Sequence, residues 1–270
     1  MGEGDVTVQG RETTDGTVGR TLAVLDLVAA FGRPVRFAEI LPVAGLPKAT
    51  LYRFLQALTH QDMLAYDEDR QTYAPGMRLV RLAHSAWAQS SLAPLAQQVL
   101  DRLAVDLGQT IHLAQLDNGA VLYVDKRNAK LPVEMFAQSG KVGPAYCTGV
   151  GKAMLAHLPE DKLAAALSRQ SFHAHTPNTL TTPDALRDEL VRIRQRGYAL
   201  DDEEHETGIA CLAAPILSGT GRILGAISVT TTTATTSRDQ LLSLAGPVTQ
   251  AAAQIAATAD TWRFPEHKQA

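Results

Sequence analysis

The pattern of hydrophobic and polar positions in residues 17–76 predicts three helices followed by a hairpin. Within residues 45–60, four large apolar side chains recur at helical spacing on one face: Leu51, Phe54, Leu55 and Leu58. Pro47 lies where this helix begins, because its fixed φ and missing N–H suit the first helical position. The opposite face carries two cations, three hydrogen-bonding side chains and no carboxylate: Lys48, Thr50, Tyr52, Arg53 and Gln56. An acid-free polar face suits the major groove of DNA, although an ordinary amphipathic surface helix has the same pattern.

Two further helices and a hairpin surround this stretch and complete a winged helix-turn-helix. Residues 18–31 predict a helix whose buried face consists of four side chains: Leu22, Leu25, Val28 and Ala29. Residues 37–41 predict a short second helix, and Gly45 lies in the tight connection to the third. Two β-prone runs within residues 63–75 flank a polar turn and predict the hairpin. Arg70 stands beside three acids in that turn, so we expect it to approach phosphate only weakly.

Residues 77–91 are predicted to form a helix that links two domains. Five apolar side chains make a narrow stripe along it: Leu79, Leu82, Ala83, Ala86 and Trp87. Such a stripe is typical of a packing seam, and a seam between subunits would pair two DNA-binding domains. Ser90 and Ser91 break the pattern before a new helix. We therefore predict five segments: a disordered leader at 1–16, the winged domain at 17–76, the linker helix at 77–91, a second domain at 92–260 and a tail at 261–270.

Strands and helices are mixed in the second domain. The β-rich runs 110–117 and 120–127 are joined by Asn118-Gly119, whose residues accept the positive φ of a tight hairpin. Further strands are expected at 132–137, 209–217 and 222–231. Helices are expected at 148–158 after an N-cap at Thr148, at 159–168, at 183–196 before Gly197, and from Ser237 to about residue 259. Hairpin connections predict an α+β fold, with an antiparallel sheet and flanking helices, and not a doubly wound parallel sheet.

Composition and charge limit the class of protein. The chain has 270 residues, of which 45% are hydrophobic, and a net charge of −3, as in soluble globular proteins of one or two domains. Residues 18–78 contain seven cations and six acids, a net charge of +1, so two copies of the winged module are expected at DNA. The chain has no secretory signal and no apolar run long enough to span a bilayer, and its two cysteines lie far apart. These features predict a reduced cytoplasmic chain.

Small and polar residues in the second domain form a candidate binding pocket. Gly149 opens a helix after Thr148, and free backbone N–H groups at such a start favour a carboxylate or phosphate. Glycines at a helix start can equally serve packing alone. Ser228 and Thr230 are two residues apart on one strand and point to the same face, with Cys211 on the preceding strand. These hydroxyls line a polar pocket or lie on the solvated face of the sheet.

Other chemistries have weaker signals. The acidic run 201–204 is expected to be a solvated loop, in which a single carboxylate turned inward could accept a hydrogen bond from a ligand hydroxyl. A metal site is conceivable from six residues: His112, His173, His175, His205, Cys147 and Cys211. They lack the compact spacing of HExxH or CxxC motifs, so we predict neither a metal nor a cofactor. A Ser–His–Asp hydrolase would need a G-x-S-x-G elbow, and Ser228 lies in mid-strand.

Three separated motifs resemble the IclR family of bacterial transcriptional regulators, from about residue 17 to residue 259. The motifs are GRTL at 19–22 with GLPKATLYRFL at 45–55, PAYCTGVGKA at 144–153, and GYALDDEE at 197–204 with GIACLAAP at 208–215. Their order along the chain is that of the family. The family usually has Ser where Gly19 stands here, which is a minor departure.

The resemblance implies a winged helix-turn-helix, a linker helix that dimerises and a GAF-like effector domain that binds a small metabolite. Members are dimers or dimer-of-dimers tetramers. In members with a bound carboxylic acid, the positions that contact the ligand match six residues here: Gly149, Val150, Asp201, Cys211, Ser228 and Thr230. Met135 and Tyr146 are candidate apolar walls of the same pocket.

We therefore predict a regulator that binds a palindromic operator as a dimer and controls a catabolic operon. Thr50, Tyr52, Arg53 and Gln56 are expected at base edges or phosphates, and Arg20, Lys48 and Arg70 at the DNA backbone. The expected effector is a small organic acid. Asp201 would accept a hydrogen bond from its hydroxyl and repel a second carboxylate, which favours hydroxy or sugar acids, with aromatic acids still possible. Two alternatives stay open: a hydrolase or metal-dependent enzyme domain fused to a DNA-binding module, and an interaction module without a ligand.

Overall fold

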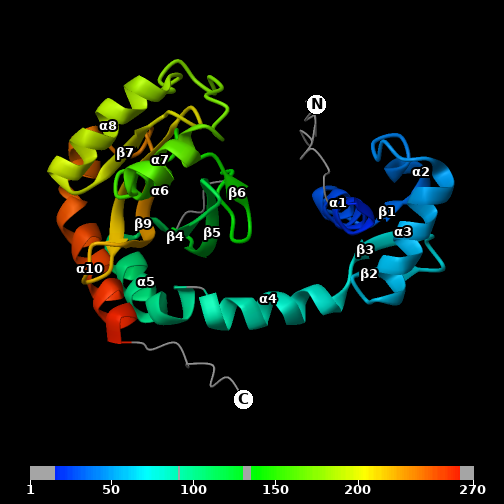
Figure 1. Cartoon of the computed structure of the whole chain (residues 1–270). Helices are drawn as coiled ribbons and strands as arrows, with labels where there is room; N and C mark the ends of the chain where they lie inside the picture. The colour runs from blue at the N-terminus through cyan, green and yellow to red at the C-terminus, as the bar shows by residue number, and fades with distance from the viewer. Residues whose placement is uncertain (1–15, 91, 130–134, 262–270) are drawn as a thin grey trace. The chain divides into compact units, whose positions relative to one another are not determined.

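The computed structural model describes residues 16–90, 92–129 and 135–261 (Figure 1). These residues form two compact units, which divide between Ala88 and Gln89. The predicted leader and tail lie outside the described residues, apart from Gly16 at the start of the first helix and Thr261 at the end of the last. No helix in the described ranges is long and apolar enough to cross a membrane.

The first unit is a winged helix-turn-helix, as predicted. Its elements are α1 (Gly16–Ala30), β1 (Val35–Arg36), α2 (Phe37–Ile40), α3 (Lys48–His60), β2 (Leu64–Asp67) and β3 (Thr72–Pro75). The strands form an antiparallel sheet in the order β1-β3-β2. The sequence pattern does not predict β1, because a two-residue strand has no periodicity of its own and depends on pairing Val35 with Tyr73.

The core of the first unit confirms the apolar face of α3 and corrects that of α1. The four predicted residues of α3 are all buried. On α1 the buried side chains are Val24, Leu25 and Val28, whereas Leu22 and Ala29 are exposed. The prediction was wrong at these two positions because residues 18–30 are apolar nearly all round, so spacing alone does not select the face that packs on α3. Pro47 is the N-cap of α3 and not its first helical residue.

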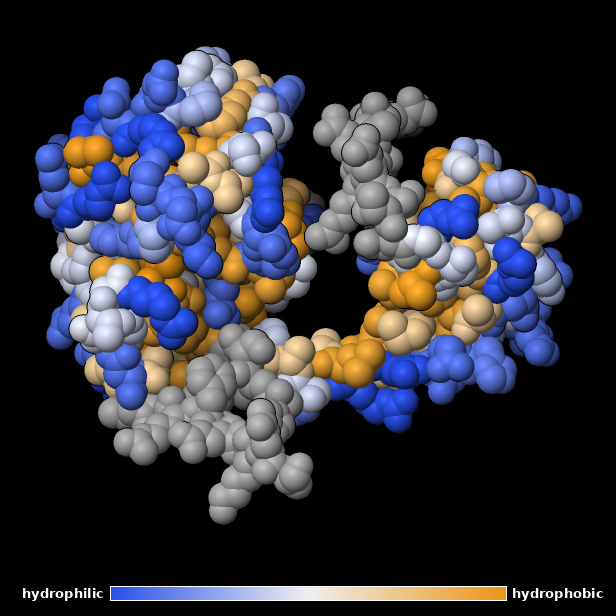
Figure 2. Space-filling view, viewed as in Figure 1, coloured by the Kyte–Doolittle hydropathy of each residue, from blue (hydrophilic) through white to orange (hydrophobic). Residues whose placement is uncertain are grey.

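α4 (Met77–Ser90) follows the winged domain. Leu79 packs partly against the core of the first unit. Beyond it, every residue from 80 to 87 is exposed, including Val80, Leu82 and Trp87. Figure 2 shows hydrophobic side chains on the surface along this helix. In a single chain, most of the predicted apolar stripe is therefore open to solvent.

The second unit is a six-stranded antiparallel sheet with helices on both faces. Its strands are β4 (Thr110–Asp117), β5 (Ala120–Arg127), β6 (Val142–Gly143), β7 (Ala199–Asp202), β8 (Ile209–Leu217) and β9 (Ile223–Thr232). They lie in the order β6-β5-β4-β9-β8-β7. Its helices are α5 (Ala93–Leu107), α6 (Gly149–Leu155), α7 (Glu160–Leu167), α8 (Pro183–Arg196), α9 (Arg238–Ser243) and α10 (Ala245–Thr261). This arrangement confirms the predicted α+β class.

Side chains of the sheet alternate between two hydrophobic clusters. Ile111 and Ile227 pack with α5 and α10 on one face. Ala114, Ala213 and Ala226 pack with α6, α7 and α8 on the other. Because strand side chains alternate with a period of two, the even-numbered residues near the middle of β4 and β9 face α6.

Local turn and capping signals are confirmed. Asn118 and Gly119 have φ values of 51° and 89°, as a two-residue hairpin with positive φ at both positions requires. Gly197 ends α8 in the left-handed conformation, and Ser237 caps α9 with its side chain. Thr148 is at the N-cap of α6, but its hydroxyl donates to the carbonyl oxygen of Pro144 at 2.8 Å and does not cap the helix.

Other boundaries differ from the prediction. The strand expected at 132–137 lies partly outside the described residues, and its described part, 135–137, is not a strand. The loop expected at 140–146 contains β6. The final helix is divided at Leu244, because Pro247 lacks an N–H and its ring clashes with the carbonyl four residues earlier in a continuous helix.

Candidate functional site

α3 presents to solvent the polar face predicted for DNA. Lys48, Tyr52, Arg53 and Gln56 are exposed, and Thr50 is half-buried. The apolar side chains of the same helix are buried in the core of the first unit. The helix therefore has a buried apolar face and a polar face that is accessible to solvent.

Two other predicted cations lie outside α3. Arg20 on α1 and Arg70 in the hairpin are exposed. The Arg70 side chain lies 3.9 Å from the carboxylate of Asp67, and its backbone N–H donates to Asp67 at 3.0 Å. This acid partly neutralises the charge at the tip of the hairpin.

A groove beside α3 contains residues that the sequence did not single out. Its walls come from β1, α2, α3 and the hairpin, and include Arg36, Phe37, Lys48, Tyr52, Tyr66 and Gln71. The Tyr52 ring meets Phe37 edge-on, with centroids 6.3 Å apart. Arg36 is exposed, whereas Arg33 is paired with Glu39 at 2.6 Å. No local signal distinguishes the two arginines, because the groove forms only when the hairpin packs against the helices.

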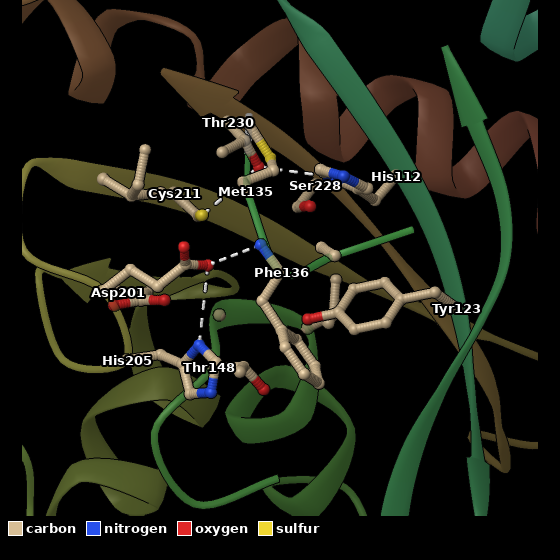
Figure 3. Close-up of a pocket in the computed structure, with 15 residues that line it drawn as sticks. His112, Tyr123, Met135, Phe136, Thr148, Asp201, His205, Cys211, Ser228 and Thr230 are labelled. Carbon is tan, nitrogen blue, oxygen red and sulfur yellow. Dashed lines mark hydrogen bonds and ion pairs between the residues drawn. The ribbon is translucent and has the colours of Figure 1, made fainter. Parts of the chain in front are cut away.

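One cavity in the second unit lies between the sheet and the first residues of α6 (Figure 3). Seven of the eight residues predicted to contact an effector line it: Met135, Gly149, Val150, Asp201, Cys211, Ser228 and Thr230. They come from the segment before β6, from α6, and from β7, β8 and β9. The cavity has a volume of about 30 Å³. This volume suits a water molecule, so an organic acid can enter only if side chains move aside.

Tyr146, the eighth predicted residue, lies outside the wall of this cavity. It is fully buried, and its hydroxyl donates to the backbone oxygen of His173 at 2.6 Å. Its ring packs on Phe172, with centroids 5.2 Å apart. Its side chain is held by the loop that follows α7, so it does not form an apolar wall of this cavity as expected.

Three strands place a hydrogen-bonded chain of side chains along the cavity. The hydroxyl oxygen of Thr230 lies 3.1 Å from Nδ1 of His112 and 3.2 Å from Sγ of Cys211. In the sheet register, Cys211 is opposite Thr230 and His112 is opposite Ser228. The hydroxyl-bearing residues are both buried. The two-residue spacing therefore brings these hydroxyls into the cavity and not to the solvated face of the sheet.

Asp201 forms part of the cavity wall at the end of β7. Its side chain is buried, and Oδ1 accepts a hydrogen bond from the backbone N–H of Glu204 at 2.8 Å. Burial, reinforced by the nearby carboxylate of Glu204, raises the pKa of Asp201 to about 7. The carboxyl is therefore protonated in part of the molecules near neutral pH.

The sequence predicted that the acidic run 201–204 would be a solvated loop. The rest of this run, like Asp201, departs from that prediction. Asp202 belongs to β7 and pairs with Arg238 at 2.8 Å. Glu203 accepts a hydrogen bond from the N–H of Gly208 at 2.7 Å. Glu204 is buried, so two of the four acids are turned inward and not one. The correction arises because β7 pairs with β8 as far as Asp202, and because Glu204, in the turn that follows, meets the buried Lys152.

The buried ion pair between Lys152 and Glu204 is the main feature that sequence analysis missed. Lys152 is only 1% exposed, and every residue of α6 is buried. A lysine within GVGKAML, a helix of small and apolar residues, is the signal that could have revealed it. Gly151 serves packing, because a Cβ there would lie 2.4 Å from the backbone oxygen of Ala145.

Further residues complete the wall without having been predicted there. The N–H of Phe136 donates to Oε1 of Glu206 at 3.0 Å, and Nδ1 of His205 lies 3.7 Å from the same oxygen. Tyr123 on β5 packs edge-on against His112, with ring centroids 5.6 Å apart. Within the described ranges, no three His, Cys, Asp or Glu residues are grouped to hold a metal ion.

Comparison with known proteins identifies the class. The chain matches the family described as bacterial transcriptional regulator IclR C-terminal over residues 84–257, and the IclR helix-turn-helix domain over residues 17–68. HTH-type transcriptional regulator XynR of Escherichia coli is 32% identical over 217 residues, which cover 80% of this chain and 86% of the relative. The crystal structure of Thermotoga maritima IclR is similar with a TM-score of 0.73 and 26% identity, covering 90% of this chain and 98% of the other. An IclR homolog from Microbacterium hydrocarbonoxydans, solved with 4-hydroxybenzoate, has the same fold, with a TM-score of 0.79, 23% identity and coverage of 90% and 98%.

Removing one partner of the buried ion pair should destabilise the second unit strongly. We expect Lys152→Met to lower the free energy of unfolding by about 3–5 kcal/mol, because it leaves the Glu204 carboxylate buried without a cation. Lys152→Met combined with Glu204→Gln removes both charges and should recover most of this loss. Urea unfolding of the full chain, followed by circular dichroism, measures the free energy of unfolding of both variants.

As a control, Arg187→Met breaks the more exposed ion pair with Glu160 and should lower the free energy of unfolding by less than about 1 kcal/mol. Equal losses in Lys152→Met and in the double variant would contradict the pair's role.

The raised pKa of Asp201 predicts a pH-dependent term in stability. Between the ordinary pKa of 3.8 and about 7, the folded state holds a proton that the unfolded state releases. This group therefore stabilises the fold fully at low pH, and its contribution is lost as the pH rises through about 7, by at most about 1.4 kcal/mol per pH unit. Asp201→Asn removes this titratable group. The urea midpoint of the variant minus that of wild type should therefore increase as the pH is raised from 5 to 8. The same substitution at the exposed Asp188 gives the baseline. A constant difference between Asp201→Asn and wild type would contradict the assignment.

Proposed function

The chain belongs to the IclR family of bacterial transcriptional regulators, and on this premise we propose that it binds a palindromic operator as a dimer and controls a catabolic operon in response to a small organic acid. The family supplies the general class, a regulator with a DNA-binding and an effector domain. The observation that carries the proposed effector site is the convergence of seven predicted residues, from separate parts of the second unit, on one buried cavity.

The DNA-binding half of the proposal depends on the exposed face of α3. Arg53 and Gln56 would reach base edges in the major groove, and Lys48 would bind the backbone. The net charge of +1 over residues 18–78 supplies few phosphate contacts for one module. A dimer supplies two modules, and its two-fold symmetry would match a palindromic operator.

The exposed apolar side chains of α4 support pairing of subunits. Leu82, Ala83, Ala86 and Trp87 are exposed in a single chain and recur at helical spacing along one side of α4. A row of exposed apolar side chains marks a surface that binds other proteins. A second copy of the helix would cover the row and fix the separation of the two α3 helices.

The polar groups of the cavity favour an acid that also carries a hydroxyl. Ser228 and Thr230 offer hydroxyl donors to a carboxylate, together with the backbone at Gly149 and Val150. Asp201 offers an acceptor to a ligand hydroxyl. Glu206, together with Asp201 in its ionised form, lines the cavity and would repel a second carboxylate. Hydroxy and sugar acids fit this pattern, and the homolog solved with 4-hydroxybenzoate keeps aromatic hydroxy acids among the candidates.

Regulation would follow from different affinities of the effector for two arrangements of the dimer. An acid that binds one arrangement more tightly shifts the population toward it, by no more than the difference in binding free energy. The spacing of the α3 helices would then change relative to the operator. By the same coupling, binding of DNA must change the affinity of the protein for the acid by the same factor.

Arg53→Ala should weaken binding to DNA without unfolding the first unit. A side chain that reads a base edge contributes about 1–3 kcal/mol, so we expect roughly a tenfold or larger loss of affinity. The measurement is fluorescence anisotropy with a duplex that wild-type protein selects from a genomic library. Arg102→Ala, an exposed arginine of the second unit, should leave affinity unchanged. Wild-type affinity in Arg53→Ala would refute the assignment of α3.

Ser228→Ala combined with Asp201→Ala should abolish stabilisation by the effector. Ligands that bind only the folded state raise its melting temperature, and this variant lacks two of the proposed polar contacts. Thermal shift with lactate, gluconate and 4-hydroxybenzoate measures the response, while anisotropy checks that DNA binding is kept. Ser168→Ala with Asp184→Ala, at two exposed positions, is the matched control. A full response in the first variant would place the effector site elsewhere.

A further inference from the structure

His112 is a buried histidine in the cavity wall that has no role in the sequence-based site. It lies near the middle of β4, between Lys126 on β5 and Ser228 on β9. It is 1% exposed and lines the cavity. Figure 3 shows it linked to Thr230 on the same side of the cavity as Ser228.

One nitrogen of this ring is satisfied and the other is not. Nδ1 is 3.1 Å from the hydroxyl oxygen of Thr230, while Nε2 forms no hydrogen bond of acceptable geometry among the described residues, although the backbone of Ala137 lies close enough to raise the pKa of the ring. A buried polar atom without a partner costs free energy, so such atoms usually bind water or a ligand. The adjoining cavity offers the space for that partner.

The imidazole is neutral, because burial lowers the pKa of His112 to about 3. One ring nitrogen therefore carries a proton and the other accepts a hydrogen bond. A neutral ring forms no ion pair with a carboxylate. Its N–H can still donate a hydrogen bond to a carboxylate, so the tautomer decides which group of the ligand can meet Nε2.

The hydrogen bonds of Thr230 determine which nitrogen is the acceptor. When the Thr230 hydroxyl donates its only proton to a ligand carboxylate, its oxygen can only accept from the His112 ring. Nδ1 must then carry the proton, and Nε2 becomes the acceptor. Cys211 can still donate to the same oxygen across 3.2 Å.

We propose that His112 is a specificity-determining residue, whose Nε2 accepts a hydrogen bond from a hydroxyl of the effector and so selects hydroxy acids over their deoxy and keto counterparts. This inference rests on the proposed function, since it requires that a carboxylate occupy the position beside Thr230. A keto group has no proton to donate, and a deoxy acid leaves Nε2 without a partner.

Matched acids and two variants of His112 test the proposal. The acids are lactate, propionate and pyruvate, and 4-hydroxybenzoate with benzoate. His112→Asn keeps a polar atom near the position of Nδ1 and removes the one at Nε2, whereas His112→Gln keeps a polar atom near Nε2. Isothermal titration calorimetry of the full chain measures each affinity, and circular dichroism checks the fold.

We expect wild type to bind at least one hydroxy acid tenfold or more tightly than its deoxy and keto analogues. In His112→Asn the preference should fall to less than threefold, and in His112→Gln part of it should return. An unchanged preference in His112→Asn, or equal affinity of wild type for hydroxy and keto acids, would overturn the role of His112 but leave the proposed effector site intact. If His112→Asn does not fold, His112→Gln decides the question, because a preference due to Asp201 alone would be unchanged in this variant and one due to His112 should be reduced. Failure of every acid to bind wild type would overturn the proposed effector class as well.

Discussion

The second unit depends on one buried ion pair, between Lys152 of α6 and Glu204 in the turn after β7. Charges removed from water lose their hydration, and they are stable in the interior only when each compensates the other. The pair therefore ties the helix that begins at Gly149 to the turn that carries Asp201. The hydroxyls of Thr176 and Thr179 donate to backbone oxygens of the same turn, each at 2.6 Å, and connect the long loop before α8 to it. Two walls of the cavity are thereby held together.

The cavity is a polar patch within an otherwise apolar contact between the sheet and α6. His112 and Cys211, on the two neighbouring strands, each hydrogen-bond to Thr230 on the strand between them. Protein cores rarely contain polar groups that lack a hydrogen-bond partner. Burying such a group lowers the stability of the fold relative to an apolar side chain of the same size. The arrangement is consistent with a binding site, in which polar atoms stay available for a ligand. The small volume also implies that an effector could bind there only with a local rearrangement.

The two units separate two kinds of recognition. The first has its own hydrophobic core and leaves the polar face of α3 accessible, while the second contains a buried cavity. α4 joins them in sequence and carries an apolar row that the described part of one chain does not cover. If subunits pair through this row, a change inside one effector domain can reach the operator only through the arrangement of subunits. The coupling is then a property of the dimer and not of a single chain.

The sequence alone determined those features that short-range physics controls. Period-two spacing placed Ser228 and Thr230 on one face, Asn118-Gly119 defined a hairpin, and helical spacing identified the buried side of α3. Only the tertiary structure decided features that depend on distant partners. Lys152 meets Glu204 across 52 residues of sequence, and Leu22 is exposed because the contact with α3 selects another face of an evenly apolar helix. The same holds for His112, whose exposed or buried state follows from the neighbouring strands and not from any pattern near it.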